Sequence, residues 1–374
     1  MKITQVTASH IAIPYDHGAP KPLQTSGRER ANMDAVYIKV ETDAGVVGWG
    51  EAYGFSCCPV TAAATRLMVA PLVEGRHLGP EGSNSVTPAD VTILMADLRK
   101  RTQSAGLNGP VGFALSGLDI ALWDIAGKTS GTPLHALVGD GGHERIAAYA
   151  SLLKLGRRDN LERVLDKARS RGFRMFKVHE RTVEMVAVAR AFLGDGVALM
   201  VDTNCAFTPD EAIAMAEKFL PYDLTWFEEP IYPPDDFEAL ARLRKVGVPI
   251  AIGENLGNLN DIKRVIAAGG VDIVQPDVSK QGGVTEFMKA LRHAHEMGVM
   301  AEPHAPYYGP ALIASVHCLA AMKHETMCEY FFSDLADYPI GEAAIPRDGW
   351  LHVPQGPGLG IEVDEKLLEK YRVS

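Results

Sequence analysis

Seven short apolar stretches decide the fold, and each ends in polar residues: FKVH (176–179), LMVDTN (199–204), WFEEP (226–230), IAIGEN (250–255), DIVQPD (272–277), VMAEPH (299–304) and MCEY (327–330). One polar landmark from each stretch, at positions 177, 202, 228, 254, 277, 304 and 329, recurs at intervals of 25, 26, 26, 23, 27 and 25 residues. This period accommodates one strand, one helix and two loops. With a further strand near 147–153, it predicts eight strands and seven intervening helices, which close naturally as a β/α barrel.

The chain before this series has a different rhythm, with strands first and helices after them. The strands are predicted at 3–13, 35–40 and 46–51, and the helices at 60–72, 88–101 and 110–127. Strands followed by helices indicate a separate α+β unit. We therefore expect an N-terminal α+β unit at 1–135, a barrel at 136–339, and a return segment at 340–374 that packs on the N-terminal unit.

The composition excludes some classes of partner. Of the 374 residues, 47% are hydrophobic and 22% are charged, as in ordinary soluble globular proteins. Lys and Arg number 37 and Asp and Glu number 47, so the net charge of −10 argues against nucleic acid or an anionic membrane as the main partner. The five cysteines form no CxxC pair, and neither a signal-peptide pattern nor a run of eighteen apolar residues occurs. We expect a cytoplasmic protein without a membrane span.

The polar landmarks lie at the carboxyl ends of their predicted strands, which is the rim where barrels of this kind build active sites. Alternate residues of a strand share a face, so Lys177 and His179 point into the barrel mouth together. Asp202 and Asn204 form a similar pair, and only one of the two glutamates in WFEEP faces inward. Successive strands thus deliver bases and acids to one rim.

Three successive inward carboxylates, Asp202, Glu228 and Glu254, suggest a metal site. Unpaired in a half-buried mouth, they would repel one another strongly. A hard divalent cation resolves this repulsion, and ligands that offer only oxygen favour Mg²⁺ over zinc. Any one of these acids alone is more simply explained as the end of a strand in a solvated loop, but three at barrel spacing are not.

Candidate bases flank this metal site. Lys177 and His179 lie on one side and His304 on the other, because the second and seventh strands face each other across the ring. Asp277 on the adjacent strand would orient and stabilise His304 as a dyad. Most of the twelve histidines are expected to be structural. Glu329 would donate a proton to a developing enolate oxygen if its pKa is raised, and it is otherwise one more solvated acid.

The motifs match a known family. KVH, VDTN, FEEP, GEN, QPDVSKQGG, PH and CEY stand in an order and spacing that resembles the enolase superfamily, in the mandelate racemase subgroup of the mandelate racemase/muconate lactonizing enzyme family. The resemblance covers essentially the whole chain. It implies an α/β fold, namely a modified TIM barrel of the (β/α)7β type with an N-terminal α+β capping domain. It also implies a Mg²⁺ cofactor and a small carboxylate substrate, and we expect a homo-oligomer.

The resemblance also implies a role for each matching residue. The roles are Mg²⁺ ligands for Asp202, Glu228 and Glu254, a base dyad for Asp277 and His304, a hydrogen bond to the enediolate for Glu329, and polar support near the site for Asn204 and Lys280.

The second barrel strand departs from the subgroup's usual KxK, because it reads Lys177-Val178-His179. Lys177 matches the position that contacts the substrate carboxylate, and His179 takes the position of the second base. Mg²⁺ and Lys177 nearby should disfavour the imidazolium of His179 and leave it able to accept a proton. His179 is therefore a base, an acid for a leaving hydroxyl, or a positioning group.

The implied chemistry is abstraction of the proton alpha to a carboxylate, with the enediolate stabilised by positive charge. The leading hypothesis is a dehydratase that converts an acid sugar to a 2-keto-3-deoxy acid. A racemase or epimerase of a hydroxy acid is the second, and a cycloisomerase of a sugar lactone or anhydro acid the third.

Specificity should come from two cap loops, at about 15–30 and 50–59, that close over the barrel mouth in this family. We expect them to offer His17, Lys21, Arg28 and Tyr53 to hydroxyls or to a distal carboxylate, although each could equally be a solvated residue. Loops this polar do not favour an aryl substrate.

Two hypotheses from other classes need comparison. A Schiff-base aldolase would use Lys177 as its nucleophile, but it would not need three clustered acids. A binding barrel without catalysis would tolerate the acids but gains nothing from bases on both sides of them.

Overall fold

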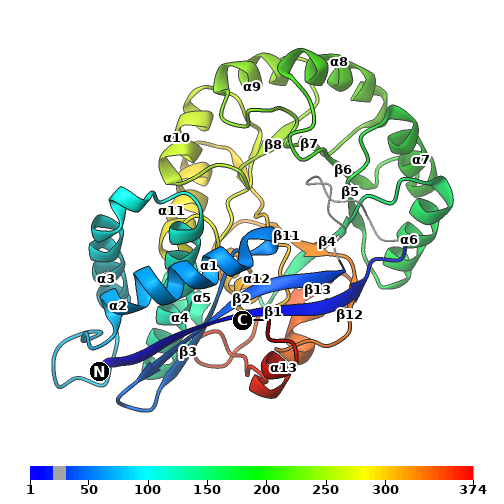
Figure 1. Ribbon diagram of the computed structural model, residues 1–374. Coiled ribbons are helices and arrows are strands. Elements are labelled where there is room, and N and C mark those ends of the chain that lie inside the picture. The colour runs from blue at the N-terminus through cyan, green and yellow to red at the C-terminus, as the bar shows by residue number, and fades with distance from the viewer. Residues whose placement is uncertain (20–30, 374) are drawn as a thin grey trace.

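Apolar strands that alternate with capped helices build the larger part of the molecule, which the computed structural model describes over residues 1–19 and 31–373. Figure 1 shows this part as a ring of strands surrounded by helices, with a smaller α+β unit at its side. The predicted fold, a (β/α)7β barrel with an N-terminal capping domain, is confirmed.

The barrel sheet has eight parallel strands in the spatial order β10-β9-β8-β7-β6-β5-β4-β11. Their bounds are β4 Arg145–Leu152, β5 Met175–Val178, β6 Ala198–Asp202, β7 Trp226–Glu228, β8 Ile250–Ile252, β9 Ile273–Val274, β10 Met300–Ala301 and β11 Met327–Phe331. Seven helices connect them: α6 Arg158–Ser170, α7 Val183–Leu193, α8 Pro209–Phe219, α9 Phe237–Arg244, α10 Leu259–Ala267, α11 Gly283–Glu296 and α12 Pro310–Ala320. The strand count and the helix count both agree with the period of about 25 residues in the sequence.

Side chains join the two ends of this strand order, β10 and β11. The buried Glu302, which follows β10, accepts hydrogen bonds on Oε2 from the Thr326 hydroxyl and the Met327 N–H, both at 2.7 Å. Glu329 in β11 accepts a bond from the Ala305 N–H at 2.9 Å. The Glu302 bonds join the carboxyl end of β10 to the amino end of β11, and the Glu329 bond joins β11 to the loop after β10.

Local sequence explains where helices begin. Thr208 and Glu211 form a capping box before α8, in which each side chain binds the other residue's backbone N–H, and Pro209 occupies the first turn. Thr87 and Asp90 do the same at α3, with Pro88 in the first turn. Such caps satisfy N–H groups that a helix start otherwise leaves without partners.

The capping domain is an antiparallel sheet covered by helices. Its strands lie in the order β12-β1-β2-β3, with bounds β1 Ile3–Asp16, β2 Asn32–Thr42, β3 Val47–Ala52 and β12 Asp334–Leu335. Its helices are α1 Cys58–Ala64, a π-helical turn Thr65–Val69, α2 Ala70–Val73, α3 Pro88–Arg101, α4 Pro110–Ser130 and α5 Leu134–Val138. The backbone of β3 lies directly on α4, since a Cβ placed on Gly50 would come within 2.0 Å of the Gly117 carbonyl oxygen.

The C-terminal segment contacts both parts of the molecule. β13 (Trp350–His352) pairs with the barrel strand β4, and after α13 (Glu365–Lys370) the chain pairs with β1 through a bridge between Ile11 and Arg372. The strand β12, which lies before position 340, belongs to the cap sheet. The segments around the predicted boundary therefore serve both units.

A buried carboxylate connects the cap to the barrel. Glu51 of β3 is 2% exposed, and its Oε2 accepts the Ala311 N–H of α12 at 3.0 Å. The start of a helix favours a negative charge, but burial dominates and raises the pKa of Glu51 from 4.5 to about 8. This contact orients β3 against the helix that follows the His304 loop.

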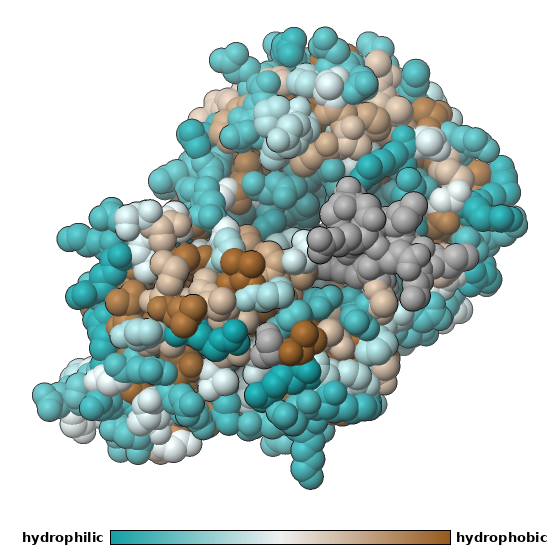
Figure 2. Space-filling model, in the orientation of Figure 1, coloured by the Kyte–Doolittle hydropathy of each residue, from teal (hydrophilic) through white to brown (hydrophobic). Residues whose placement is uncertain are grey.

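One helical run, Phe55–Val73, is long and apolar enough to cross a membrane by length and composition alone. This is weak evidence, because the core helix of a globular protein passes the same test. Its inner residues, such as Ala62 and Val69, are fully buried in the cap core. Leu67 of this run is 76% exposed. Figure 2 shows hydrophobic surface over the part of the cap where Figure 1 draws α1 and α2.

The Glu51 contact predicts a pH dependence of stability. The pKa of Glu51 is higher in the folded protein than in the unfolded chain, so between pH 4.5 and about 8 the folded protein holds a proton on Glu51 that the unfolded chain has lost. The contribution of Glu51 to the free energy of unfolding therefore falls as the pH rises through this window. Glu51→Gln should therefore flatten the decline in unfolding free energy with pH, as measured by urea titration. Glu342→Gln, at an exposed glutamate, is the control. An unchanged slope in Glu51→Gln would contradict the assignment.

Candidate active site

The carboxyl ends of the barrel strands bring the predicted residues to one rim. Asp202 and Glu228, the last residues of β6 and β7, are register partners on neighbouring strands. Glu254 lies just beyond β8, Asp277 beyond β9 and His304 beyond β10, in the same spatial order. In Figure 2, hydrophilic residues surround a hollow between the barrel and the cap.

Lys177 is the centre of a buried ion cluster. Its Nζ lies 2.5 Å from Glu228 Oε1, 2.8 Å from Glu329 Oε1 and 3.6 Å from Asp202 Oδ2. None of these four side chains is more than 2% exposed. Burial opposes the ammonium charge, but the three carboxylates outweigh it, so the pKa of Lys177 is raised well above its ordinary value. A firmly protonated Lys177 is unsuited to the nucleophilic role that a Schiff-base aldolase requires.

Glu229, the second glutamate of the WFEEP motif, has different partners from Glu228. Its Oε1 accepts the Gly253 N–H at 2.9 Å, and its Oε2 accepts the Cys205 thiol at 3.3 Å. The two glutamates therefore do not share the Lys177 cluster, in line with the expected alternation along the strand.

Glu329 differs from one sequence expectation. The sequence left two possibilities open, a proton donor if the pKa of Glu329 is raised, or a solvated acid. Glu329 is buried, and Lys177 and His304 overcome the effect of burial and lower its pKa to about 2. An ionised carboxylate can only accept hydrogen bonds. Glu329 therefore holds Lys177 in place, and Lys177 is the group with protons to donate.

His304 and Asp277 contact each other, as the predicted dyad requires. His304 Nδ1 lies 2.7 Å from Asp277 Oδ2, and His304 Nε2 lies 2.6 Å from Glu254 Oε2. Burial lowers the pKa of His304, but Glu254 and Asp277 together raise it well above its ordinary value. Since an ionised aspartate only accepts, the Nδ1–H donates to Asp277 and the Nε2 faces the rim.

Two residues around Asp277 were missed by the sequence analysis. The Tyr307 hydroxyl donates to Asp277 Oδ2 at 2.5 Å, and the Ser279 N–H donates to Oδ1 at 2.8 Å. The Ser279 hydroxyl, 2.5 Å from Tyr307 Oη, can then donate to the tyrosine. Ser279 could have been found as a polar residue two positions after an aspartate, a common turn pattern. Tyr307 lies in an irregular loop, where periodicity gives no indication of direction.

His179 reaches the same carboxylate as Lys177. Its Nδ1 lies 2.6 Å from the Leu152 carbonyl oxygen, which fixes Nδ1–H as the donor, and its Nε2 lies 3.0 Å from Asp202 Oδ2. Burial and Lys177 both lower the pKa of His179, but Asp202 outweighs them and raises it. Lys177 acts in the expected direction, but the expectation of a neutral imidazole rested on Mg²⁺ as well, and it left out the effect of Asp202.

The supporting residues lie at the edge of the cluster. Asn204 donates twice to Asp202 Oδ1, from its backbone N–H at 2.8 Å and from Nδ2 at 3.0 Å. Lys280 places its Nζ 4.5 Å from the centre of the Tyr53 ring, which comes from the second cap loop. Tyr53 thus reaches the barrel from the cap, as the hypothesis for this loop requires.

The first cap loop gives less support. His17 is buried, and its Nε2 has no hydrogen-bond partner among the described residues. Its ring centre lies 6.0 Å from that of Tyr15, and within residues 1–19 and 31–373 no hydrogen bond or ion pair joins it to the rim cluster. Lys21 and Arg28 lie outside the described residues.

The chemistry of the donor set fits Mg²⁺. Asp202, Glu228 and Glu254 offer only oxygen, from three neighbouring strands. Glu228 Oε2 already accepts bonds from Trp226 Nε1 at 2.7 Å and Gln275 Nε2 at 2.8 Å, which orient the carboxylate. Burial, with Asp202 and Glu329 nearby, still raises the pKa of Glu228 to about 8, so a divalent cation there would favour its charged form.

Comparisons with known proteins agree over the whole chain. Residues 10–139 match the family model described as "Mandelate racemase / muconate lactonizing enzyme, N-terminal domain", and residues 160–367 match "Enolase C-terminal domain-like".

Three similar proteins illustrate the range of known activities. D-galactarolactone cycloisomerase of Agrobacterium fabrum is 30% identical over 395 residues, covering 100% of this chain and 99% of its own. Arabinonate dehydratase of Saccharolobus solfataricus is 30% identical over 363 residues, 94% of each chain. A racemase from Streptomyces coelicolor A3(2), solved with bound magnesium, is 28% identical with a TM-score of 0.85 over 99% of this chain and 100% of its own.

The ion cluster predicts a large loss of stability when its cation is removed. Lys177→Met leaves Asp202, Glu228 and Glu329 buried without their shared partner, which should lower the unfolding free energy in EDTA by about 3–5 kcal/mol. Lys323→Met, which breaks an exposed pair with Asp140, should change it by less than about 1 kcal/mol. Urea unfolding of both variants measures this difference. Equal stability of Lys177→Met and the wild type would contradict the role of the ammonium.

Proposed function

Because the chain belongs to the mandelate racemase/muconate lactonizing enzyme family of the enolase superfamily, we propose that it is a Mg²⁺-dependent acid-sugar dehydratase. Its substrate is a small sugar acid, and its product is a 2-keto-3-deoxy acid. A homo-oligomeric state and a cytoplasmic location remain predictions from the sequence.

The observation that carries this proposal is the placement of two histidines on either side of the three carboxylates. His304 approaches Glu254 at 2.6 Å, and His179 approaches Asp202 at 3.0 Å. Each histidine has its Nδ1 fixed by an acceptor, Asp277 or the Leu152 carbonyl, so each presents Nε2 to the rim. A dehydratase needs one group to remove a proton and another to protonate the leaving hydroxyl.

The first step is removal of the alpha proton. When held by Asp202, Glu228 and Glu254, Mg²⁺ supplies positive charge where negative charge develops on the substrate carboxylate. With Glu254 so engaged, His304 Nε2 can take the proton, and Asp277 stabilises the imidazolium that results. Ser279 and Tyr307 hold Asp277, so the base keeps its orientation during the transfer.

The second step is loss of the β-hydroxyl. The electron pair left by the alpha proton forms the C2=C3 bond as the C3–O bond breaks, and the hydroxyl leaves as water with a proton from His179 Nε2. The enol product then tautomerises to the 2-keto acid. Lys177 donates to the substrate carboxylate in both steps, in keeping with its position beside Glu228 and Glu329.

A cycloisomerase is the second candidate. The cycloisomerase of Agrobacterium fabrum is similar over the full length of both chains. The same base would remove the alpha proton from a sugar lactone or anhydro acid, and the leaving oxygen would remain in the molecule as a ring opens. The net reaction then loses no water.

A screen of sugar acids, diacids and their lactones in D₂O distinguishes these outcomes. We expect a 2-keto-3-deoxy product, detected as a carbonyl adduct and by NMR, with activity that EDTA abolishes. A keto product that retains all the heavy atoms of the substrate, with no loss of water, supports the cycloisomerase. Deuterium at C2 without a keto product supports a racemase or epimerase. Full activity in EDTA, or no turnover and no exchange with any compound, would overturn the proposal.

Variants separate the two histidines. His304→Asn should lower turnover about 100-fold or more and stop exchange of the alpha proton with solvent. His179→Asn should prevent the loss of water from the substrate but retain exchange of the alpha proton. His352→Asn, at an exposed histidine of β13, is the control and should behave as the wild type. Normal exchange in His304→Asn would show that His304 is not the base.

A further inference from the structure

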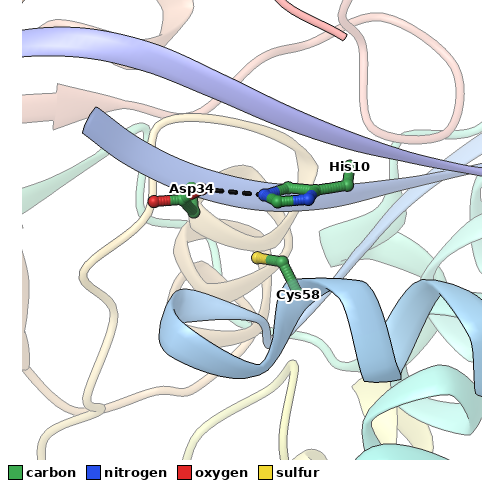
Figure 3. A group of neighbouring side chains, drawn as sticks. All are labelled: His10, Asp34 and Cys58. Carbon is green, nitrogen blue, oxygen red and sulfur yellow. Dashed lines mark hydrogen bonds and ion pairs between the residues drawn. The ribbon is translucent and has the colours of Figure 1, made fainter. Parts of the chain in front are cut away.

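The capping domain contains a second group of metal-ligand side chains, far in sequence from the barrel carboxylates. His10, Asp34 and Cys58 each offer one ligand atom, and these atoms lie within 4.8 Å of one another. Figure 3 shows the Cys58 sulfur pointing toward the space between the His10 ring and the Asp34 carboxylate.

The fold explains why these three residues meet. His10 of β1 pairs with Val36 of β2, and Asp34 stands two positions earlier on β2, so His10 and Asp34 are diagonal neighbours on one face of the sheet. Cys58 is the first residue of α1, which packs on this face. The arrangement depends on strand register and on helix placement together.

The backbone makes room for the thiol. A Cβ placed on Gly54 would come within 2.1 Å of Cys58 Sγ, although the φ of Gly54 is −137°, a value open to any residue. The glycine is therefore required by space at the sulfur and not by backbone conformation.

The His10 side chain is incompletely satisfied. Its Nε2 lies 2.7 Å from Asp34 Oδ1, whereas its Nδ1 is buried and has no hydrogen-bond partner. The residue is only 5% exposed. Because the two ring nitrogens point in different directions, Nε2 is the nitrogen that can bind an ion shared with Asp34, and the unpartnered Nδ1 on the other side of the ring is not a ligand of that ion.

We propose that His10, Asp34 and Cys58 bind a divalent ion of intermediate softness, such as Zn²⁺. An imidazole, a carboxylate and a thiolate are ligands that zinc accepts and that magnesium does not prefer. On binding, the Cys58 thiol loses its proton to solvent, and the thiolate and the carboxylate together neutralise the two charges of the ion. Asp34 is 26% exposed, so the ion and a water ligand can reach the site from its side.

The location gives this site a function in the cap. Asp34 lies just after the first predicted cap loop, and Cys58 lies at the end of the second. An ion that joins β1, β2 and α1 fixes the residue that follows the first cap loop, Asp34, relative to the residue at the end of the second, Cys58. The site is independent of the proposed reaction, and its ion is distinct from Mg²⁺ in the barrel.

Cobalt titration of the full chain tests the site, because a Co²⁺–thiolate bond produces a charge-transfer absorption in the near ultraviolet and oxygen ligands do not. The protein is first stripped with EDTA and then saturated with Mg²⁺ to fill the barrel site. We expect one equivalent of Co²⁺ to produce the thiolate absorption and Zn²⁺ to displace it. The absence of this absorption in the wild type would overturn the proposal.

Matched cysteine variants identify the ligand. Cys58→Ser should abolish the absorption, whereas Cys57→Ser, at the neighbouring half-buried cysteine, should retain it. Cys205→Ser is the critical control, since Cys205 lies next to Glu229 at the barrel rim. Absorption that disappears in Cys205→Ser and persists in Cys58→Ser would place the ion in the barrel and refute the cap site.

Two further variants keep the test decisive if Cys58→Ser does not fold. Asp34→Asn and His10→Gln should each weaken Co²⁺ binding at least about tenfold, with circular dichroism in EDTA to verify the fold. Wild-type affinity in both variants would contradict the proposal.

Discussion

Mutual repulsion among carboxylates at the barrel rim is the constraint on which the site depends. The neighbouring strands β6 and β7 bring Asp202 and Glu228, and the non-adjacent strand β11 brings Glu329, into a region with no more than 2% exposure. Charges so buried persist only with partners of opposite sign. The Lys177 ammonium is that partner, and its own pKa rises in response. Among the proposed catalytic groups, His179 contacts this cluster directly through Asp202.

On the other side of the rim, the dyad of His304 and Asp277 also pairs a buried carboxylate with a cationic group. His304 bridges Glu254 and Asp277, and Asp277 is in turn held by Ser279 and Tyr307. Fixing one ring nitrogen by a carboxylate leaves the other in a defined place, which is what proton transfer requires. The cap reaches the barrel through Tyr53, whose ring centre lies 4.5 Å from Lys280 Nζ.

The sequence predicted the barrel because a single polar residue per strand recurs with the length of one β/α unit. It predicted which residues share the rim, since strand alternation places Lys177 and His179 on one face. It left open whether Glu329 donates a proton, because the pKa of Glu329 depends on the distance to Lys177 Nζ. It missed Tyr307, which an irregular loop carries. The group of His10, Asp34 and Cys58 was not found either, because it depends on strand register and helix packing.

The central claim is that Asp202, Glu228 and Glu254 hold one hard divalent ion at the rim. Crystals grown with Mn²⁺ in place of Mg²⁺ test it most directly, since manganese scatters anomalously. The account predicts a single strong anomalous peak bonded to one oxygen of each of these three carboxylates, with His304 released from Glu254. Well-ordered density for the three acids with no peak between them, or a peak bound by other residues alone, would contradict the account.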